Sequence, residues 1–260
     1  MSVAEDARGE VAAPDGVVDR VALITGGTRR LGRAIALELG GAGYRVAITY
    51  RQSEREAAAT VEELRALGVN RGVDAQAFRM DVASEASVAE ATAAVMRRFG
   101  RVDALVNNAG VHEAEALAEM SVESWDAAFA VHARGPMLVT RALLAELRLR
   151  RGRVVHIGSL GGGRAWTRYA HYCASKAALE SLTRTMARAF APEVSVNCVA
   201  PGWIEMEGAE AGEAAHFAAK TPMGRNGRAG EVAAAVRFFL TGPEFITGQV
   251  LAVDGGLGLV

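Results

Sequence analysis

Short apolar runs alternate with longer helical stretches from Arg20 to the end of this chain, and this alternation limits the folds open to it. Several runs are apolar almost without interruption, as expected for strands that are covered on both faces. The seven predicted strands are VALIT (21–25), RVAITY (45–50), AQAFRM (75–80), VDALVN (102–107), RVVHIG (153–158), VSVNCV (194–199) and QVLAV (249–253). The predicted helices lie near 32–42, 53–67, 84–99, 121–149, 170–191 and 229–240. The pattern predicts an α/β fold with a seven-stranded, doubly wound parallel sheet and helices on both faces.

The length and composition of the chain favour one domain preceded by a short tail. With 260 residues, half of them apolar, the chain can bury a large core, and no shift in composition marks a second domain. Residues 1–19 are small and acidic with Pro and Gly, which predicts a flexible N-terminal tail before a domain spanning 20–260. The stretch 203–228 lacks the alternation and is predicted to be irregular. Because it follows a predicted strand at the sheet edge where ligands bind, we expect it to act as a substrate lid.

The charge balance and the cysteines exclude several classes of function. A formal net charge of −1 and a pI near 6.5 argue against nucleic acid or a membrane surface as a partner. Cys173 and Cys198 form no spaced set with histidines, so we expect no metal site and no disulfide framework, and a reducing, cytoplasmic location is favoured. No apolar run approaches about 20 residues and no basic-then-apolar leader is seen, so neither a membrane span nor an export signal is expected.

Tyr172 and Lys176 are one helical turn apart in YCASK and indicate acid–base chemistry. Residues at i and i+4 share a helix face, so the phenol and the ammonium can point into one cleft. A nearby cation favours the phenolate, and we therefore expect Lys176 to lower the pKa of Tyr172. Only two of the 29 lysines and arginines are lysines, Lys176 and Lys220. Ser159, which closes the apolar run VVHIGS, precedes the pair by thirteen residues.

A glycine-bearing turn joins the first predicted strand to the first predicted helix. Gly26, Gly27 and Gly32 allow tight turning and close approach of a pyrophosphate to the helix N-terminus, where free N–H groups favour anions. A glycine-rich turn is weak evidence alone, but its position directly after strand one strengthens it. The turn therefore predicts a dinucleotide site.

The residues after the second predicted strand indicate which dinucleotide is bound. A chain that selects NAD usually offers a carboxylate there for the ribose 2′-hydroxyl, whereas this chain has Thr49-Tyr50-Arg51. Arg51 with Arg29 or Arg30 makes a basic rim suited to a 2′-phosphate, so NADP(H) is preferred. The alternative is that these arginines face solvent and that backbone contacts decide the cofactor.

Taken in order, TGGTRRLG (25–32), NNAG (107–110), Ser159, YCASK (172–176) and PGWI (201–204) resemble the motifs of the short-chain dehydrogenase/reductase family. The resemblance covers about residues 20–260 and implies a single-domain Rossmann fold. The chain looks closest to NADP-dependent carbonyl reductases of that family, such as 3-oxoacyl-carrier-protein reductases. With Arg30 where many members have Gly, it is also similar to pteridine reductases.

The resemblance implies roles for matching residues. Tyr172 would be the proton donor to the carbonyl oxygen, with Lys176 assisting it and Ser159 holding the substrate carbonyl. The implied cofactor-binding residues are Gly26, Thr28, Arg29, Arg30, Leu31, Gly32, Tyr50, Arg51, Asp81, Val82, Asn108, Ala109, Gly110, Tyr172, Lys176, Pro201, Gly202 and Ile204. Alternatively, Asn107 and Asn108 could merely tie strand ends together.

Two positions depart from the family pattern. His132 stands where the family has a catalytic Asn, and the imidazole could replace the proton relay of that Asn or be a packed histidine. If His132 is a relay, His132→Asn is expected to keep activity but to alter its pH profile. Met206 stands where the family carries Thr, which removes a hydroxyl contact with the cofactor.

Residues that flank the matched motifs are candidates for a substrate pocket. They are Ser159, His112, Leu160, Trp166, Tyr169, Trp203 and Met206. Several are aromatic, which favours a flat or bulky carbonyl compound such as a polyketide-like ketone, although aromatic side chains also commonly fill cores.

The two longest predicted helices carry more apolar positions than one sheet face requires. These positions are Met137, Leu138, Leu143, Leu144, Leu179, Leu182 and Met186. Family members use these helices for subunit contacts, so the resemblance implies a homo-oligomer, either a tetramer or a dimer.

The sequence favours NADPH-dependent reduction of a ketone or aldehyde to an alcohol, with a small-molecule carbonyl compound as its partner. Two alternatives stay open: an NAD(P)-dependent alcohol dehydrogenase that works in the oxidative direction, and a non-catalytic NADP-sensing binding protein. The steady-state rates with NAD and with NADP would distinguish the oxidative dehydrogenase from the favoured NADPH-dependent reductase. The second would be expected to have lost Tyr172 or Lys176, and both are present.

Overall fold

The computed structural model describes residues 19–67, 73–206, 208 and 210–260. Its main sheet is parallel throughout, with the strand order β3-β2-β1-β4-β5-β6-β9. The strands are β1 (Val21–Ile24), β2 (Arg45–Tyr50), β3 (Ala75–Arg79), β4 (Ala104–Asn107), β5 (Arg153–Ile157), β6 (Ser195–Pro201) and β9 (Val250–Val253). All seven predicted strands are therefore confirmed, as is the doubly wound sheet. The predicted N-terminal tail, apart from Asp19, lies outside the described residues.

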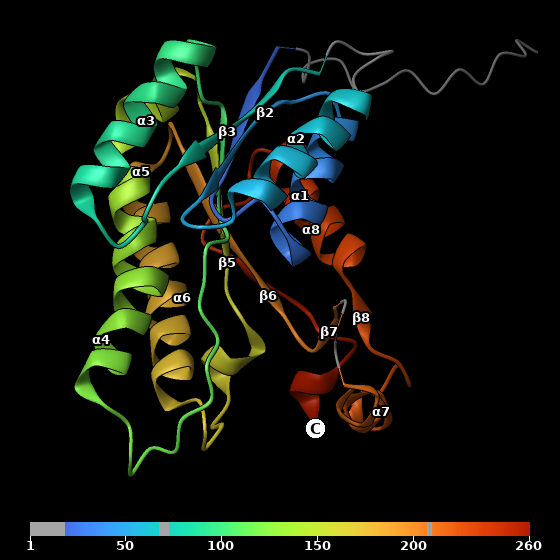
Figure 1. The fold of residues 1–260 in the computed structure, drawn as a ribbon. Helices are drawn as coiled ribbons and strands as arrows, with labels where there is room; N and C mark the ends of the chain where they lie inside the picture. The colour runs from blue at the N-terminus through green and yellow to red at the C-terminus, as the bar shows by residue number, and fades with distance from the viewer. Residues whose placement is uncertain (1–18, 68–72, 207, 209) are drawn as a thin grey trace, which may run out of the picture.

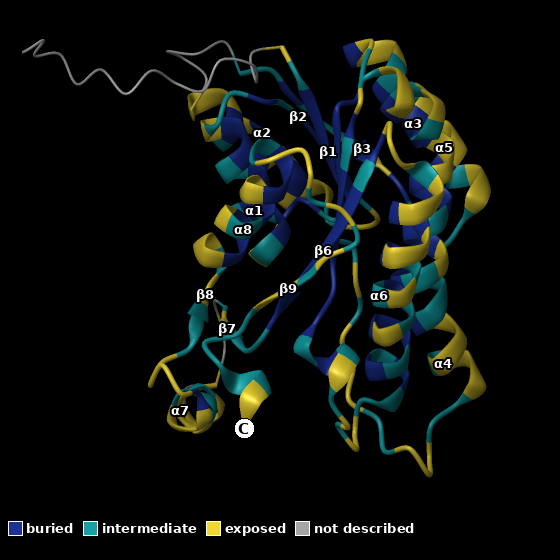
Figure 2. Cartoon of the chain, turned by 180° about the vertical axis from the view of Figure 1, so that it is seen from behind, coloured by how far each residue is buried: buried dark blue, intermediate teal, exposed yellow. Residues whose placement is uncertain are grey.

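Helices cover both faces of the sheet, as Figure 1 shows. On one face lie α1 (Arg30–Gly41), α2 (Glu54–Leu67) and α8 (Ala229–Thr241), and on the other lie α3 (Glu85–Phe99), α4 (Val122–Phe129), α5 (Gly135–Leu149) and α6 (Ala170–Phe190). Each layer has its own apolar core against the sheet. In Figure 2 the central strands are buried, while the edge strand β9 and the outer faces of the helices are more exposed. This three-layer arrangement is that of a single-domain Rossmann fold.

Local sequence explains several helix ends. The side chain of Ser84 caps α3 by accepting a hydrogen bond from the backbone N–H of Ser87. At the other end of α3, Gly100 adopts φ +74°, the left-handed conformation that glycine reaches without a Cβ clash. Side chains and backbone thus satisfy groups that a helix end leaves unpaired.

The predicted helix 121–149 is interrupted. A π-helical segment, Ala130–Arg134, separates α4 from α5, and Pro136 lies in the first turn of α5. Proline has no N–H to donate, and in a regular helix its ring would clash with the carbonyl four residues earlier, that of His132. The wider π turn accommodates the proline, and it places His132 at the centre of the interruption.

The stretch 203–228 is more ordered than predicted. It contains the helix α7 (Ala211–Lys220) and a small parallel ladder between β7 (Ile204–Glu205) and β8 (Gly227–Arg228). The expectation of an irregular segment was therefore wrong in this respect. Mixed charge and glycine hid a helix that begins without a side-chain cap at Glu210.

The seven apolar positions that were expected to be surplus on the long helices are not surplus. Leu138, Leu143, Leu179 and Met186 are buried. Met137, Leu144 and Leu182 pack against the same core. The helix α6 contacts α4 and α5 as well as the sheet, and α5 contacts α3 and α6 as well as the sheet, so these helices have more than one apolar face to cover.

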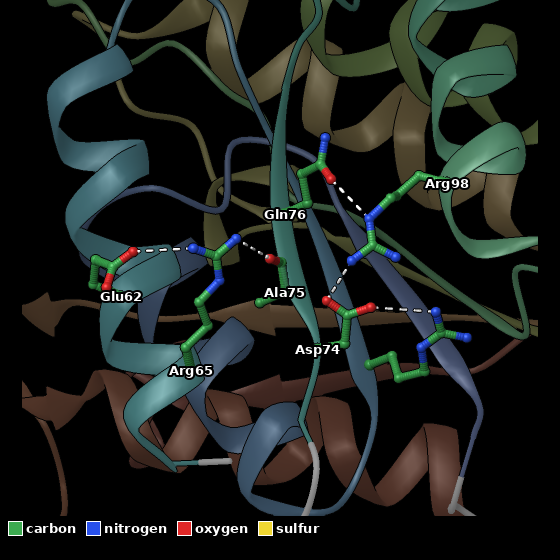
Figure 3. A network of polar contacts seen from close by, with 7 residues as sticks. Glu62, Arg65, Asp74, Ala75, Gln76 and Arg98 are labelled. Carbon is green, nitrogen blue, oxygen red and sulfur yellow. Dashed lines mark hydrogen bonds and ion pairs between the residues drawn. The ribbon is translucent and has the colours of Figure 1, made fainter. Parts of the chain in front are cut away.

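A polar network ties β3, the strand at one sheet edge, to its neighbours (Figure 3). Asp74 accepts hydrogen bonds from Arg98 at 2.6 Å and from Arg45 at 3.3 Å. Across the strand, Arg65 donates to the backbone carbonyl of Ala75 at 3.2 Å and pairs with Glu62. The network fastens the edge strand to α2, α3 and β2 at the amino-terminal end of the sheet, away from the carboxyl ends where ligands bind.

Candidate active site

The predicted cofactor residues gather at the carboxyl ends of five strands. Gly26–Gly32 follow β1, Tyr50 and Arg51 end β2, and Asp81 and Val82 follow β3. Asn108–Gly110 follow β4, Pro201 ends β6, and Gly202–Ile204 come directly after it. The strand order reverses between β1 and β4, and in doubly wound sheets this switch point is where ligands bind.

The glycine turn after β1 has no room for side chains. Gly26 adopts φ +63°, and a Cβ on Gly32 would lie 2.1 Å from the carbonyl oxygen of Gly26. Within the described part of the chain, no side chain caps the N-terminus of α1 at Arg29. Bare backbone and uncapped N–H groups fit a dinucleotide pyrophosphate, so these residues would hold the phosphates of a nicotinamide cofactor.

Asn108 fastens the loop after β4 to the glycine turn. Its side-chain nitrogen donates to the carbonyl oxygens of Thr25 at 2.9 Å and Gly26 at 3.0 Å. The Thr25 hydroxyl in turn accepts from the backbone N–H groups of Asn108 and Ala109, both at 3.0 Å. Asn108 therefore ties strand ends together and shapes the cradle. Sequence reasoning missed Thr25, although it opens the TGGTRRLG motif.

The first Asn of the NNAG motif is also a structural tie. Asn107 is buried and donates to Thr140 on α5 and to Nδ1 of His156 on β5. This alternative was open in the sequence, and the contacts favour it.

Three arginines lie exposed around the cradle. They are Arg29, Arg30 and Arg51, at the start of α1 and the end of β2. Arg30 adopts φ +50°, a left-handed conformation that a residue with a Cβ rarely takes. This strain falls at the position where many short-chain dehydrogenases/reductases have glycine.

The remaining cofactor candidates differ in accessibility. Thr28, Val82 and Pro201 are buried, and Val82 packs against Gly135. Asp81 accepts a hydrogen bond from the backbone of Ala83 at 2.9 Å, which shapes the turn after β3. Leu31, Tyr50, Ala109, Gly202 and Ile204 are half-buried, and Gly110 is exposed.

Ser159, Tyr172 and Lys176 lie together. The Nζ atom of Lys176 is 5.7 Å from the ring centroid of Tyr172 and donates to the carbonyl oxygen of Ile157 at 2.7 Å. Ser159 and Lys176 are both buried. The end of β5 and the first turns of α6 thus bring a hydroxyl, a phenol and an amine to one point.

The pKa values of this trio correct one expectation. Burial raises the pKa of Tyr172, and a hydrogen bond with the Ser159 hydroxyl opposes the rise. Burial lowers the pKa of Lys176 to about 8. The expected lowering of the tyrosine pKa by Lys176 is therefore wrong for the chain by itself, because desolvation dominates and the amine is engaged with the Ile157 carbonyl.

His132 is enclosed and hydrogen-bonded on both ring nitrogens. Nε2 accepts from the backbone N–H of Val111 at 3.0 Å, so the proton resides on Nδ1. Nδ1 then donates to the hydroxyl of Ser175 at 2.8 Å, and Ser175 donates to the backbone carbonyl of Tyr172 at 2.9 Å. The imidazole thus connects the loop after β4 to the turn of α6 that carries the tyrosine. Sequence reasoning missed Ser175, although it lies inside YCASK.

Burial, with a smaller contribution from the charge of Lys176, lowers the pKa of His132 to about 2. A histidine with this pKa stays neutral between about pH 5 and pH 9. The structure therefore favours the packed, positioning histidine over a titrating relay, and His132→Asn is now expected to leave the pH profile unchanged.

The candidate substrate residues form two groups. Tyr169 stacks on His112 with ring centroids 4.6 Å apart, and His112 also meets Tyr172 edge-on at 4.7 Å. The Trp166 ring lies parallel to Tyr172 at 6.3 Å. In the second group, Trp203 stacks on Phe217 of α7 at 5.5 Å. Leu160 and Met206 are half-buried; Leu160 directly follows Ser159, and Met206 lies two residues after Ile204.

A phenol and an amine near the carboxyl end of β5, in a doubly wound sheet whose first strand is followed by a glycine turn suited to phosphates, are typical of an α/β oxidoreductase with a nicotinamide cofactor. A family model described as "Enoyl-(Acyl carrier protein) reductase" matches residues 26–258. The chain belongs to the short-chain dehydrogenase/reductase family.

Known proteins of this family resemble the chain over nearly its whole length. A 3-oxoacyl-[acyl-carrier-protein] reductase of Synechocystis sp. is 36% identical over 242 residues, which cover 92% of this chain and 96% of the relative. The reductase of the same name from Rattus norvegicus is 35% identical over 243 residues, 93% and 99% of the two chains.

Solved structures agree with this assignment. A short-chain dehydrogenase/reductase from Serratia marcescens superposes with a TM-score of 0.86 at 32% identity, covering 93% of this chain and 99% of that one. A protein described as a putative gluconate dehydrogenase from Agrobacterium tumefaciens gives 0.87 at 31% identity, covering 94% and 98%. Among the described residues, no helix is long and apolar enough to span a membrane.

Proposed function

We propose that this chain is an NADPH-dependent ketoreductase that reduces a ketone or aldehyde to an alcohol. The observation that carries the proposal is the convergence of Ser159, Tyr172 and Lys176 at the same edge of the sheet as the glycine cradle. The names of the curated 3-oxoacyl-[acyl-carrier-protein] reductases support the direction of reaction.

In the proposed reaction, the bound cofactor supplies a hydride to the carbonyl carbon. Tyr172 donates its phenolic proton to the carbonyl oxygen, which yields the alcohol. The Ser159 hydroxyl holds the carbonyl oxygen and favours the phenolate as the proton leaves. In the chain by itself the Lys176 amine donates to the Ile157 carbonyl and does not lower the pKa of Tyr172. In the cofactor-bound enzyme Lys176, whose Nζ atom lies 5.7 Å from the centre of the tyrosine ring, would assist by placing its charge near the phenolate.

The preference for NADPH rests on the three exposed arginines around the cradle. A 2′-phosphate would meet the Arg51 guanidinium and that of Arg29 or Arg30, and the end of β2 offers no carboxylate in Thr49-Tyr50-Arg51. If the chain instead works as a dehydrogenase with NAD, the steady-state rate of alcohol oxidation with NAD will exceed the rate of carbonyl reduction with NADPH.

Tyr172→Phe tests the chemistry. The phenylalanine keeps the ring contacts but has no proton to give, so carbonyl reduction is expected to fall by about 100- to 10,000-fold. Tyr44→Phe is the matched control, because it also removes a buried phenol, one that donates to the Leu240 carbonyl just before the amino-terminal end of β2, away from the carboxyl ends of the strands. Folding and cofactor affinity are measured in parallel by chemical unfolding and by quenching of protein fluorescence. Undiminished reduction by folded, cofactor-binding Tyr172→Phe would overturn the proposal, and a protein inert with every carbonyl compound tested would favour the cofactor-sensing alternative.

A bulky or aromatic carbonyl compound is the proposed substrate class. Its support is the cluster of His112, Trp166 and Tyr169 rings around the phenol, together with the stack of Trp203 on Phe217 in the segment after β6. A panel of ketones of increasing size, assayed by NADPH oxidation, tests it. Activity confined to small aliphatic ketones would contradict it.

We also propose that α7 with residues 203–228 closes over the substrate. The stack of Phe217 on Trp203 joins the helix to the segment that follows β6.

Two free cysteines are consistent with the proposed reducing, cytoplasmic location.

A homo-oligomer, either a tetramer or a dimer, completes the proposal. Its support is a set of exposed apolar side chains on α8, in the loop that follows it, on the edge strand β9 and in the turn after β9. They are Phe238, Phe245, Leu251 and Leu259. An exposed edge strand with apolar neighbours is a surface that a second copy can cover.

A further inference from the structure

Ser159 is held by the turn that it opens. This serine turn, residues 159–164, contains the 3₁₀ segment Leu160–Gly163. The Ser159 hydroxyl accepts from the backbone N–H of Gly161 at 3.0 Å, and its carbonyl accepts from Gly162 at 2.9 Å. A Cβ on Gly161 would lie 2.9 Å from the Trp166 ring. The orientation of the hydroxyl therefore depends on where the whole turn sits.

The last residue of the serine turn reaches a distant part of the chain. Nη2 of Arg164 donates to the carbonyl oxygens of Leu257 at 2.8 Å and Val260 at 2.6 Å. Beside this bond, the Leu160 side chain packs against Gly258, where an added Cβ would lie 3.0 Å from it. A polar and an apolar contact thus attach the serine turn to residues 254–260, the terminal turn.

Hydrogen bonds within the terminal turn and to a neighbouring segment fix its conformation. The Asp254 carboxylate accepts from the backbone N–H groups of Gly256 at 2.9 Å and Gly258 at 2.7 Å. Gly255 and Gly256 adopt φ +62° and +86°, which turn the chain back toward the site. The Gly255 carbonyl also accepts from the backbone of Met223, directly after α7, at 3.2 Å.

The terminal turn also meets the segment after β6. The backbone N–H of Gly202 donates to Val253 at 3.0 Å, and a Cβ on Gly202 would lie 2.6 Å from the Cβ of Asp254. The terminal turn thus contacts the base of α7, the predicted cofactor segment and the serine turn. The polar contact between the terminal turn and the serine turn is made by the Arg164 side chain.

We propose that Arg164 is a positioning residue, which fixes the Ser159 hydroxyl by fastening the serine turn to the terminal turn. The catalytic part of this inference rests on the proposed function, whereas the structural part does not. Within the described residues, Arg164 donates to two carbonyl oxygens with one nitrogen, and a neutral side chain of similar length would hold them more weakly.

Hydrogen exchange tests the structural part without any assay of activity. In Arg164→Gln, amides of the segments 159–164 and 254–260 are expected to exchange about tenfold faster than in the wild type. This is the effect expected because roughly one charge-assisted hydrogen bond is lost. Arg164→Lys, which keeps a cationic donor, should restore much of the protection. Arg168→Gln is the matched control, since Arg168 is an exposed neighbour that engages Glu115 through its backbone carbonyl. Unchanged exchange of both segments in Arg164→Gln would overturn the proposal.

Gly258→Ala tests the same attachment from the other side. Its Cβ would lie 2.7 Å from the Asp254 carboxylate as well as close to Leu160, so the terminal turn must shift. Faster exchange in the serine turn is expected here too. Exchange changes confined to 254–260 in this variant would show that the two turns are not coupled and would count against the proposal.

The pH dependence of reduction tests the catalytic part. The Ser159 hydrogen bond opposes the burial-driven rise in the pKa of Tyr172, so a misplaced hydroxyl should move the alkaline limb of kcat/KM to higher pH. In Arg164→Gln we expect this move with about tenfold lower kcat and unchanged affinity for NADPH. A lower kcat with an unmoved alkaline limb would refute positioning through Ser159. If the wild type reduces no carbonyl compound, the proposed function fails, while the exchange result still decides the attachment.

Discussion

Two neutral histidines in the core should make this protein sensitive to mild acid. Burial and, to a lesser degree, the charge of Lys176 lower the pKa of His132 to about 2 and that of His156 to about 3. His132 is also influenced by His112 and His171, which face it from the loop after β4 and from α6. Both imidazoles are almost completely inaccessible to solvent. In the unfolded chain each would titrate near its ordinary pKa of about 6.5.

The sign and size of the effect follow from these values. Because the folded-state pKa lies below the unfolded-state pKa, the unfolded chain takes up the proton first as the pH falls. The stabilising contribution is complete above about pH 6.5 and is lost progressively below it, down to the folded pKa. Between about pH 7 and pH 5, each histidine should cost about 2 kcal/mol of unfolding free energy, or about 4 kcal/mol for the pair.

Chemical unfolding at one protein concentration, at pH 7 and at pH 5, measures the loss. Carboxylates contribute to the pH dependence as well, so the informative quantity is the difference between the wild type and a variant. In His132→Asn or His156→Asn the acid-induced loss should shrink by about 2 kcal/mol, and in the double variant by about 4 kcal/mol. His216→Asn, at an exposed position, is the control and should match the wild type. An equal acid-induced loss in the wild type and the double variant would refute the reasoning.

Three further predictions follow from the site and the surface. Gly32→Ala should weaken binding of NADPH by at least about tenfold, measured by fluorescence titration, because its Cβ would lie 2.1 Å from the Gly26 carbonyl oxygen; wild-type affinity would contradict a phosphate cradle here. Arg51→Ala should lower the preference for NADPH over NADH by about 10- to 100-fold in kcat/KM, the value of one charged hydrogen bond; an unchanged ratio would assign the preference to other contacts. Leu251→Glu should reduce the mass of the particle in light scattering, since a charge on the exposed edge strand opposes its burial by a second copy; an unchanged oligomer would place the interface elsewhere.

Much of the fold could be predicted because its determinants are local. Uninterrupted apolar runs such as VALI in β1 are buried throughout, as a parallel strand between two helical layers requires. The cap at Ser84 depends on residues three apart in the chain. The break at 130–134 also had a local signal in Pro136, but a helical spacing on both sides of the proline masked it.

Other features could not be predicted because their partners are distant in the chain. Thr25 gains its role from the backbone of Asn108 and Ala109, more than eighty residues away. From the sequence alone, the apolar positions of α5 and α6 predict a subunit surface, whereas in the structure these helices pack against α3 and α4 as well as against the sheet.

By itself, the sequence determined the alternating architecture and the set of motifs, since periodicity and the spacing of Tyr172 and Lys176 are properties of neighbouring residues. Only the tertiary structure decided the protonation of the site. Whether burial or a charge controls the pKa of Tyr172 depends on how completely the surrounding elements exclude water and on which partner each group finds. The same holds for His132, where a backbone N–H from one loop and a hydroxyl from α6 select the tautomer.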